Sequence, residues 1–184
     1  MLRYSADQLT PLMLSLHGAG GDARRGLALL QNLADETGFL LLALSSFQQT
    51  WDVIRGGYGS DVLLIDRALE RTFSRYNVDP THVGIGGFSD GASYALSLGI
   101  TNGDLFSHVI AFSPGFMAPT AQEGTPRFFI SHGTEDQVLP IDRCSRRIVP
   151  QLEKAGYRVR YLEFGGGHTV PEDIAREAVD WFRS

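Results

Sequence analysis

A serine set between closely spaced glycines is the residue of this sequence best suited to nucleophilic chemistry. Residues 87–91 read Gly-Phe-Ser-Asp-Gly, which places Ser89 at the centre of a G-x-S-x-G pattern. In this pattern the serine occupies a sharp turn between a strand and a helix, and the flanking glycines let the two elements approach closely. The N-terminus of the helix also favours negative charge beside the serine. The pattern predicts a nucleophile at Ser89.

Two other interpretations of this glycine-rich turn are weaker. A dinucleotide-binding fingerprint requires G-x-G-x-x-G, but Ser89 stands where the third glycine after Gly84 and Gly86 would have to be. A plain turn that carries a solvated serine is the second alternative. The position of Ser89 between an apolar run and a segment rich in small residues favours its interpretation as a nucleophile.

A serine hydroxyl needs a general base, usually a histidine that a carboxylate holds in place. In proteins with this serine pattern the acid follows the serine along the chain and the histidine comes last. His168 meets this requirement, because it follows three glycines in a loop between the last predicted strand and the last predicted helix. A surface histidine without a catalytic role is the alternative. The other four histidines are interpreted as structural or turn-shaping: His17, His82, His108 and His132.

Two neighbouring acidic residues qualify as the orienting carboxylate. Residues 132–140 follow the fifth predicted strand, and both Glu135 and Asp136 lie in this loop. Asp142 comes later, inside the next predicted helix, where it is interpreted as a first-turn charge. Nucleophile, acid and base then fall at strand ends in the expected order, which is more specific than any single motif.

The loop after the first predicted strand is rich in small residues and reads Leu-His-Gly-Ala-Gly-Gly-Asp at 16–22. No Gly-Lys-Ser/Thr follows, which argues against a phosphate-binding P-loop. Small residues let a backbone N–H approach a reacting carbonyl, so we expect the amides of Ala19 and Asp90 to form an oxyanion hole. One such donor stabilises a transition state by about 2.7–4 kcal/mol. A plain tight turn is the alternative.

The elements that must position these residues alternate along the chain. Near-continuous apolar runs are typical of a parallel sheet buried on both faces, and the amphipathic stretches between them predict helices. We therefore expect one α/β domain over residues 1–184, with a doubly wound, mostly parallel sheet whose functional loops lie at the carboxyl ends of the strands. The predicted strands are 12–16, 39–44, 82–85, 108–112, 127–131 and 158–164.

Three helices carry the clearest signals. Apolar residues between 62 and 76 recur at helical spacing, and a last helix follows Pro171 with Glu172 in its first turn. A third helix is predicted over 140–154, which Pro150 is expected to kink or end.

Composition excludes several classes of protein. The 184 residues carry 16 basic and 21 acidic side chains, a net charge of −5, which argues against nucleic acid or an anionic membrane surface as a partner. The longest apolar run, 39–44, is too short to span a membrane, and the one cysteine, Cys144, fits a reducing compartment. We expect a cytoplasmic protein. No cluster has metal-ligand spacing, so neither a metal nor an organic cofactor is expected.

Glycine is over-represented, at 21 residues. Three of its clusters coincide with the proposed oxyanion loop, the Ser89 turn and the His168 loop. A fourth, at 56–59, has no assignment from the sequence.

Four blocks in order resemble the phospholipase/carboxylesterase family of α/β-hydrolases, which is related to acyl-protein thioesterases and dienelactone hydrolases. They read Leu-His-Gly-Ala-Gly-Gly-Asp at 16–22, Gly-Phe-Ser-Asp-Gly at 87–91, His-Gly-Thr-Glu-Asp at 132–136 and Gly-Gly-His at 166–168. The resemblance implies that Ser89 is the nucleophile, Asp136 the acid and His168 the base. Carboxylesterases usually have Gln after the serine, where this chain has Asp90.

The resemblance also implies an esterase of small, soluble substrates. The leading hairpin of the family is expected to be reduced, and residues 114–126 leave room for a short loop rather than a lid domain. Alternatives are an acyl-thioesterase, a small peptidase or a non-catalytic ligand-binding protein, and a homodimer is an open possibility. Five residues in or beside the carboxyl-end loops are predicted to line the substrate pocket, with ordinary packing as the alternative: Trp51, Phe88, Phe116, Met117 and Leu139.

Overall fold

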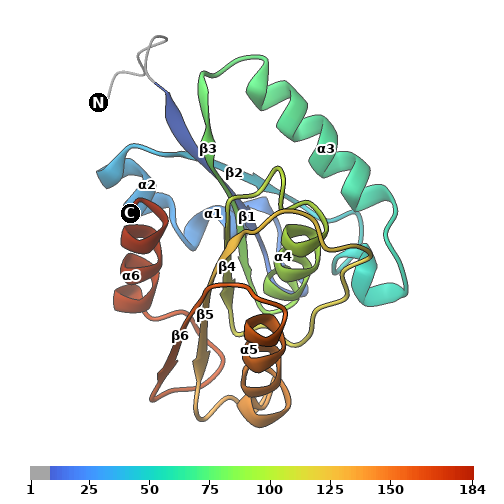
Figure 1. The fold of residues 1–184 in the computed structure, drawn as a ribbon, viewed down its shortest axis with the longest axis vertical. Coiled ribbons are helices and arrows are strands. Elements are labelled where there is room, and N and C mark those ends of the chain that lie inside the picture. The colour runs from blue at the N-terminus through green and yellow to red at the C-terminus, as the bar shows by residue number, and fades with distance from the viewer. Residues whose placement is uncertain (1–8) are drawn as a thin grey trace.

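The computed structural model describes residues 9–184, which pack around one six-stranded sheet (Figure 1). Neighbouring strands all run parallel, in the order β2-β1-β3-β4-β5-β6. The doubly wound α/β fold predicted from the sequence is confirmed, and each predicted strand is present. The strands are β1 (Thr10–Leu16), β2 (Leu40–Leu44), β3 (Val78–Phe88), β4 (His108–Phe112), β5 (Arg127–Gly133) and β6 (Val159–Phe164).

Helices cover both faces of the sheet (Figure 1). One face carries α3 (Ser60–Phe73), α4 (Asp90–Thr101) and α5 (Ser145–Lys154), and the other carries α1 (Ala23–Ala28), α2 (Gln31–Thr37) and α6 (Glu172–Phe182). Two short 3₁₀ turns, η1 (Asp52–Arg55) and η2 (Ile141–Arg143), lie in the connections.

Each central strand is apolar on both sides because it faces two cores. In β1, Leu12 and Leu14 pack with α3, α4 and α5, whereas Met13 between them packs with α2 and α6. Side chains of a strand alternate between the faces, so a strand covered on both sides reads as an unbroken apolar run.

The helix predicted over 140–154 differs from the observed one. α5 begins only at Ser145, after η2, and continues through Pro150 to Lys154, so the helix does not end at the proline. Pro150 is exposed and lacks only one backbone donor. The burial of Ile148, Val149 and Leu152 on the opposite face holds the helix together.

The connection from β4 to β5, residues 113–126, contains neither helix nor strand, so no lid domain is inserted there. A hairpin before β1 would fall at residues 1–8, outside the described part of the chain. Among residues 9–184, no helix is long and apolar enough to cross a membrane.

The candidate site lies where the winding of the sheet reverses. The connection from β1 to β2 passes over one face through α1 and α2, and that from β2 to β3 passes over the other through α3. Between the neighbouring strands β1 and β3 the two connections diverge, which leaves a crevice at their carboxyl ends. The loop 17–22 and the turn at Ser89 meet there.

Two glycines allow this meeting. A methyl group added to Gly91 would lie 2.5 Å from the carbonyl oxygen of His17, and one added to Gly87 would lie 2.7 Å from that of Leu16. Both contacts are with backbone, which cannot rotate away as a side chain can. The glycines of the G-x-S-x-G pattern therefore bring α4 and β3 into contact with the end of β1.

We predict that Gly91→Ala lowers the free energy of unfolding by about 1–3 kcal/mol, because the added methyl group overpacks a backbone contact. Urea unfolding measures the change. Gly165→Ala is the matched control, since its methyl group would meet nothing within 4 Å. Equal stability of the two variants would contradict the close approach.

Candidate active site

Ser89 occupies a strained turn at the carboxyl end of β3. Its φ of 57° and ψ of −121° are rarely adopted by a residue with a side chain, and it directly precedes α4. Its backbone N–H donates to the carbonyl oxygen of Phe112 in β4, at 3.0 Å. The residue is 8% exposed, so the turn presents its hydroxyl at the surface of an otherwise buried segment.

His168 and Asp136 complete a hydrogen-bonded chain with this serine. Nε2 of His168 lies 2.9 Å from Oγ of Ser89, and Nδ1 lies 2.6 Å from Oδ2 of Asp136. A carboxylate only accepts hydrogen bonds, so Nδ1 carries the proton and Nε2 accepts from the serine hydroxyl. The ring of Phe88 packs against the imidazole, with ring centroids 4.6 Å apart.

Asp136, rather than Glu135, is brought to the histidine. Oδ1 of Asp136 accepts the backbone N–H groups of Val138 and Leu139, at 2.9 and 2.8 Å. Burial tends to raise the pKa of Asp136, but these bonds and the contact with His168 lower it below its ordinary value. Glu135 is exposed. The Asp136 side chain is therefore a fixed, ionised carboxylate at neutral pH.

A second histidine touches the same carboxylate. Nε2 of the fully buried His132 lies 2.7 Å from the carbonyl oxygen of Leu139 and 3.3 Å from Oδ2 of Asp136. Both are acceptors, so Nε2 carries the proton, and Nδ1 accepts from the hydroxyl of Ser145 at 2.7 Å. His132 is thus more than a turn-shaping residue, since its N–H faces the oxygen that accepts from His168. Local spacing does not signal this contact, because His132 lies in β5 and Asp136 in the turn that follows it.

Of the two predicted oxyanion donors, Ala19 lies in loop 17–22, and Asp90 directly follows Ser89 as the first residue of α4. Within residues 9–184, the backbone N–H of neither Ala19 nor Asp90 donates to another protein group. Loop 17–22 is held around them, because Nδ1 of His17 bonds the carbonyl oxygen of Gly18 at 2.7 Å and the N–H of Gly20 donates to Gln49. A Cβ at Gly18 would lie 3.3 Å from that of Ser89, so this loop packs directly on the serine.

The side chain of Asp90 turns toward the connection between β2 and α3. Its Oδ2 accepts the hydroxyl of Thr50 at 2.6 Å. The carboxylate that replaces the family's usual Gln is therefore engaged by a hydroxyl donor.

Trp51 lies in the core rather than in a substrate pocket, which corrects its predicted role. It is 0% exposed, its ring stacks on Tyr94, and its Nε1 donates to the carbonyl oxygen of His17 at 2.9 Å. A large aromatic side chain near a strand end predicts pocket lining, but the single polar atom of Trp51 instead supports loop 17–22 through His17.

A cavity of about 340 Å³ opens beside Ser89 and His168. Of the predicted pocket residues it contains only Phe88; Phe116, Met117 and Leu139, like Trp51, are absent from its wall. Leu139 instead donates its N–H to Asp136, and Met117 packs against the core. The rest of the wall is formed by His17, Gly18, Ala19, Arg25, Leu29 and Val138.

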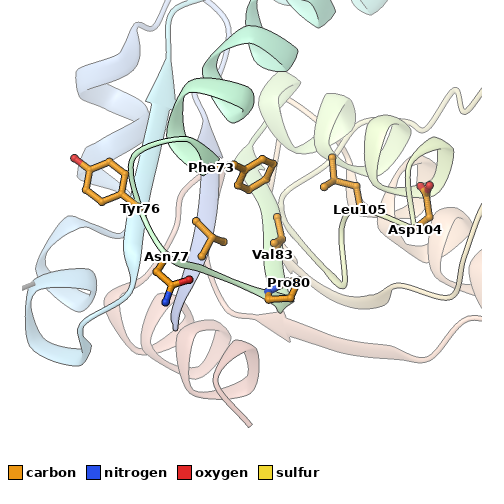
Figure 2. Close-up of a pocket in the computed structure, with 8 residues that line it drawn as sticks. Phe73, Tyr76, Asn77, Pro80, Val83, Asp104 and Leu105 are labelled. Atoms are coloured by element: carbon orange, nitrogen blue, oxygen red, sulfur yellow. The ribbon is translucent and has the colours of Figure 1, made fainter. Parts of the chain in front are cut away.

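A slightly larger cavity, of about 380 Å³, lies at the other end of the sheet (Figure 2). It is bounded by the end of α3, the first half of β3 and the turn after α4, with Phe73, Pro80 and Leu105 in its wall. Its one acidic residue, Asp104, has no histidine or nucleophile beside it in this wall. The smaller cavity is therefore the candidate reaction site. No cluster of three His, Cys, Asp or Glu residues in the described chain could hold a metal ion.

The parallel sheet, the strained turn at Ser89 and the histidine in the loop after the last strand define an α/β-hydrolase fold. Residues 61–180 match the model of the phospholipase/carboxylesterase family, and the chain belongs to that family of hydrolases. The esterase PE8 has a similar structure, with a TM-score of 0.79 and 24% identity over 99% of this chain and 95% of PE8.

Two relatives are similar in sequence. The bifunctional acetylxylan esterase/xylanase XynS20E of Neocallimastix patriciarum is 30% identical over 71% of this chain and 20% of its own length. NocK of Nocardia uniformis subsp. tsuyamanensis is 29% identical over 73% of this chain and 42% of its own length. The chain thus spans a fifth to about two fifths of these curated relatives.

The burial of His132 gives a prediction about pH and stability. Burial lowers the pKa of His132 below its ordinary 6.5, so the unfolded chain binds a proton there before the folded protein does. The stability that the neutral imidazole contributes is complete above about pH 6.5 and is lost as the pH falls below it. We expect His132→Gln, which keeps an N–H donor but cannot titrate, to lose less stability than the natural protein between pH 7 and 5.

Urea unfolding at several pH values measures this difference. Parallel stability curves for the two proteins would contradict a buried, neutral His132.

Proposed function

We propose that this protein is a serine hydrolase that cleaves carboxylic esters through an acyl-enzyme on Ser89. The observation that carries the proposal is the continuous chain from Ser89 Oγ through His168 to Asp136, with contacts of 2.9 and 2.6 Å. A serine becomes a strong nucleophile when a neutral imidazole accepts its proton and a carboxylate fixes the tautomer.

In the first half of the reaction, Oγ of Ser89 attacks the ester carbonyl carbon while its proton passes to Nε2 of His168. Asp136 keeps the proton on Nδ1 and offsets the positive charge of the imidazolium. The oxyanion accepts the free N–H groups of Ala19 and Asp90. His168 then gives its proton to the leaving alcohol, and the C–O bond of the ester breaks.

In the second half, water attacks the acyl-enzyme. His168 takes a proton from the water and returns it to Ser89 as the acid leaves. Oδ1 of Asp136 accepts from Val138 and Leu139 while Oδ2 accepts from His168, so the carboxylate has donors on both oxygens and little freedom to rotate.

A small substrate fits the cavity best. Its volume of about 340 Å³ is near the lower end for ligand pockets, and no lid covers it between β4 and β5. The esterase named among the relatives supports carboxylic esters as the substrate class. Cleavage of a thioester or a peptide would begin with the same attack of Ser89 on a carbonyl carbon, so assays with each substrate class distinguish these alternatives. A cytoplasmic location and a homodimer stay predictions.

The nucleophile is tested with a fluorophosphonate probe. We expect the probe to label Ser89 in the natural protein, and Ser89→Ala to abolish both labelling and the hydrolysis of p-nitrophenyl esters. Mass spectrometry locates the labelled residue, and acyl-thioesters assayed in parallel rank the two substrate classes. A folded protein that neither labels nor turns over would favour the non-catalytic binder, and turnover by the alanine variant would exclude the mechanism.

The acid is tested with a matched pair of variants. Asp136→Asn is expected to lower kcat by about 10⁴-fold, because an amide stabilises the wrong imidazole tautomer. Glu135→Gln changes the adjacent carboxyl in the same way but should leave kcat within about twofold, since that side chain is exposed. The opposite ranking would move the acid to Glu135.

A further inference from the structure

An arginine lies in the wall of the cavity that holds Ser89 and His168. Arg25 and Leu29 both line this cavity, and four residues of spacing place them on the same side of α1 and its C-cap. That side faces the serine, whereas the buried Gly26 packs on the sheet. Arg24 is also exposed but is not part of the cavity wall.

The charge of Arg25 is uncompensated at this site. The cavity wall contains no acidic residue, and its other members are apolar, glycine, serine or histidine. Among residues 9–184, the guanidinium forms no ion pair and no hydrogen bond; only the backbone N–H of Arg25 is engaged, by Asp22 at 3.0 Å. An arginine in a mainly apolar wall beside a nucleophile has a planar set of donors available to a bound molecule.

We propose that Arg25 makes the enzyme selective for esters that carry a second, ionised carboxylate. The inference rests on the proposed serine hydrolase and adds its substrate class. A guanidinium binds a carboxylate through two parallel N–H bonds, which orients the ester as well as attracting it. The attraction is useful here because the chain has a net charge of −5, which by itself disfavours an anionic substrate.

A carboxylate fits the single arginine better than a phosphate does. A phosphate monoester carries about −1.5 to −2 charges at pH 7, so one guanidinium would leave negative charge beside the forming oxyanion. A carboxylate carries one charge, which one guanidinium balances. A neutral ester would gain nothing from Arg25.

The test compares acidic and neutral members of two substrate pairs. In the first pair the charge is on the acyl side: 4-nitrophenyl hydrogen glutarate against its methyl ester. In the second it is on the leaving group: 4-acetoxybenzoate against methyl 4-acetoxybenzoate. The Ser89→Ala variant gives the uncatalysed rate, and 4-acetoxyphenyl phosphate distinguishes a phosphate from a carboxylate preference.

We expect Arg25→Gln to lower the ratio of kcat/KM for the acidic member to kcat/KM for the neutral member of at least one pair about tenfold, as for the loss of a hydrogen bond between charged groups. The affected pair identifies the side of the ester that faces α1. Arg24→Gln is the control and should leave both ratios unchanged. Added salt should reduce the preference of the natural enzyme but not that of Arg25→Gln.

Equal ratios in the natural enzyme, Arg25→Gln and Arg24→Gln would overturn the role of Arg25, as would a stronger preference for the phosphate than for the carboxylates. Fluorophosphonate labelling of Ser89 in each variant keeps this result separate from failure of the proposed function. A protein that labels and cleaves the neutral esters but ignores charge contradicts only the inference about Arg25.

Discussion

The backbone of Ser89 keeps its unfavourable φ of 57° because two strands and a helix hold it from different sides. β4 accepts its N–H through Phe112, the first turn of α4 bonds its carbonyl oxygen through Ser93, and the carbonyl oxygens at the end of β1 press against Gly87 and Gly91. A strained residue of this kind costs about 1–3 kcal/mol and persists only where its surroundings over-determine it. Gly18 of the loop that follows β1 packs directly on Ser89, so the contacts that hold the strained turn also bring this loop to the nucleophile.

Support for the loops of the site comes from polar groups that never face the cavity. Asp61, which is 2% exposed, accepts the backbone N–H groups of Phe47 and Asp52, and Asp52 accepts those of Gly59 and Asp61. These bonds close the long connection between β2 and α3 on itself. They also explain the glycine cluster at 56–59, where φ values of 111° and 158° at two glycines let the chain turn within that closed loop. Trp51, which belongs to the same connection, donates its Nε1–H to the carbonyl oxygen of His17 and so links this connection to loop 17–22.

Much of the fold and of the site's outline was predictable because it depends on local pattern. Strands whose alternating side chains are buried on both faces of the sheet appear as apolar runs in the sequence. The Ser89 turn requires glycines two residues before and two residues after the serine. The acid was ambiguous in the sequence, since choosing Asp136 over Glu135 depends on which way two adjacent side chains point. Pro150 was misjudged because a long-range apolar contact, invisible in local spacing, outweighs one missing hydrogen bond. The role of Trp51 likewise depends on partners that are distant in the sequence. The orientation of Arg25 toward the cavity could not be predicted either, because α1 has six residues and is too short to show an apolar stripe.

The proposed oxyanion donors are both main-chain groups, and this has a consequence for how such a protein can change over generations. Substitution cannot delete an amide N–H except by proline, so this part of the apparatus is insulated from most mutations. Part of the cavity wall, by contrast, consists of exchangeable side chains: Arg25 and Leu29 on α1 and its C-cap, and Val138 on the loop after β5. Mutations can therefore change the substrates that the cavity accepts while the two backbone N–H groups that stabilise the developing charge stay in place. A fold of this kind can give rise to proteins with different substrates and the same reaction.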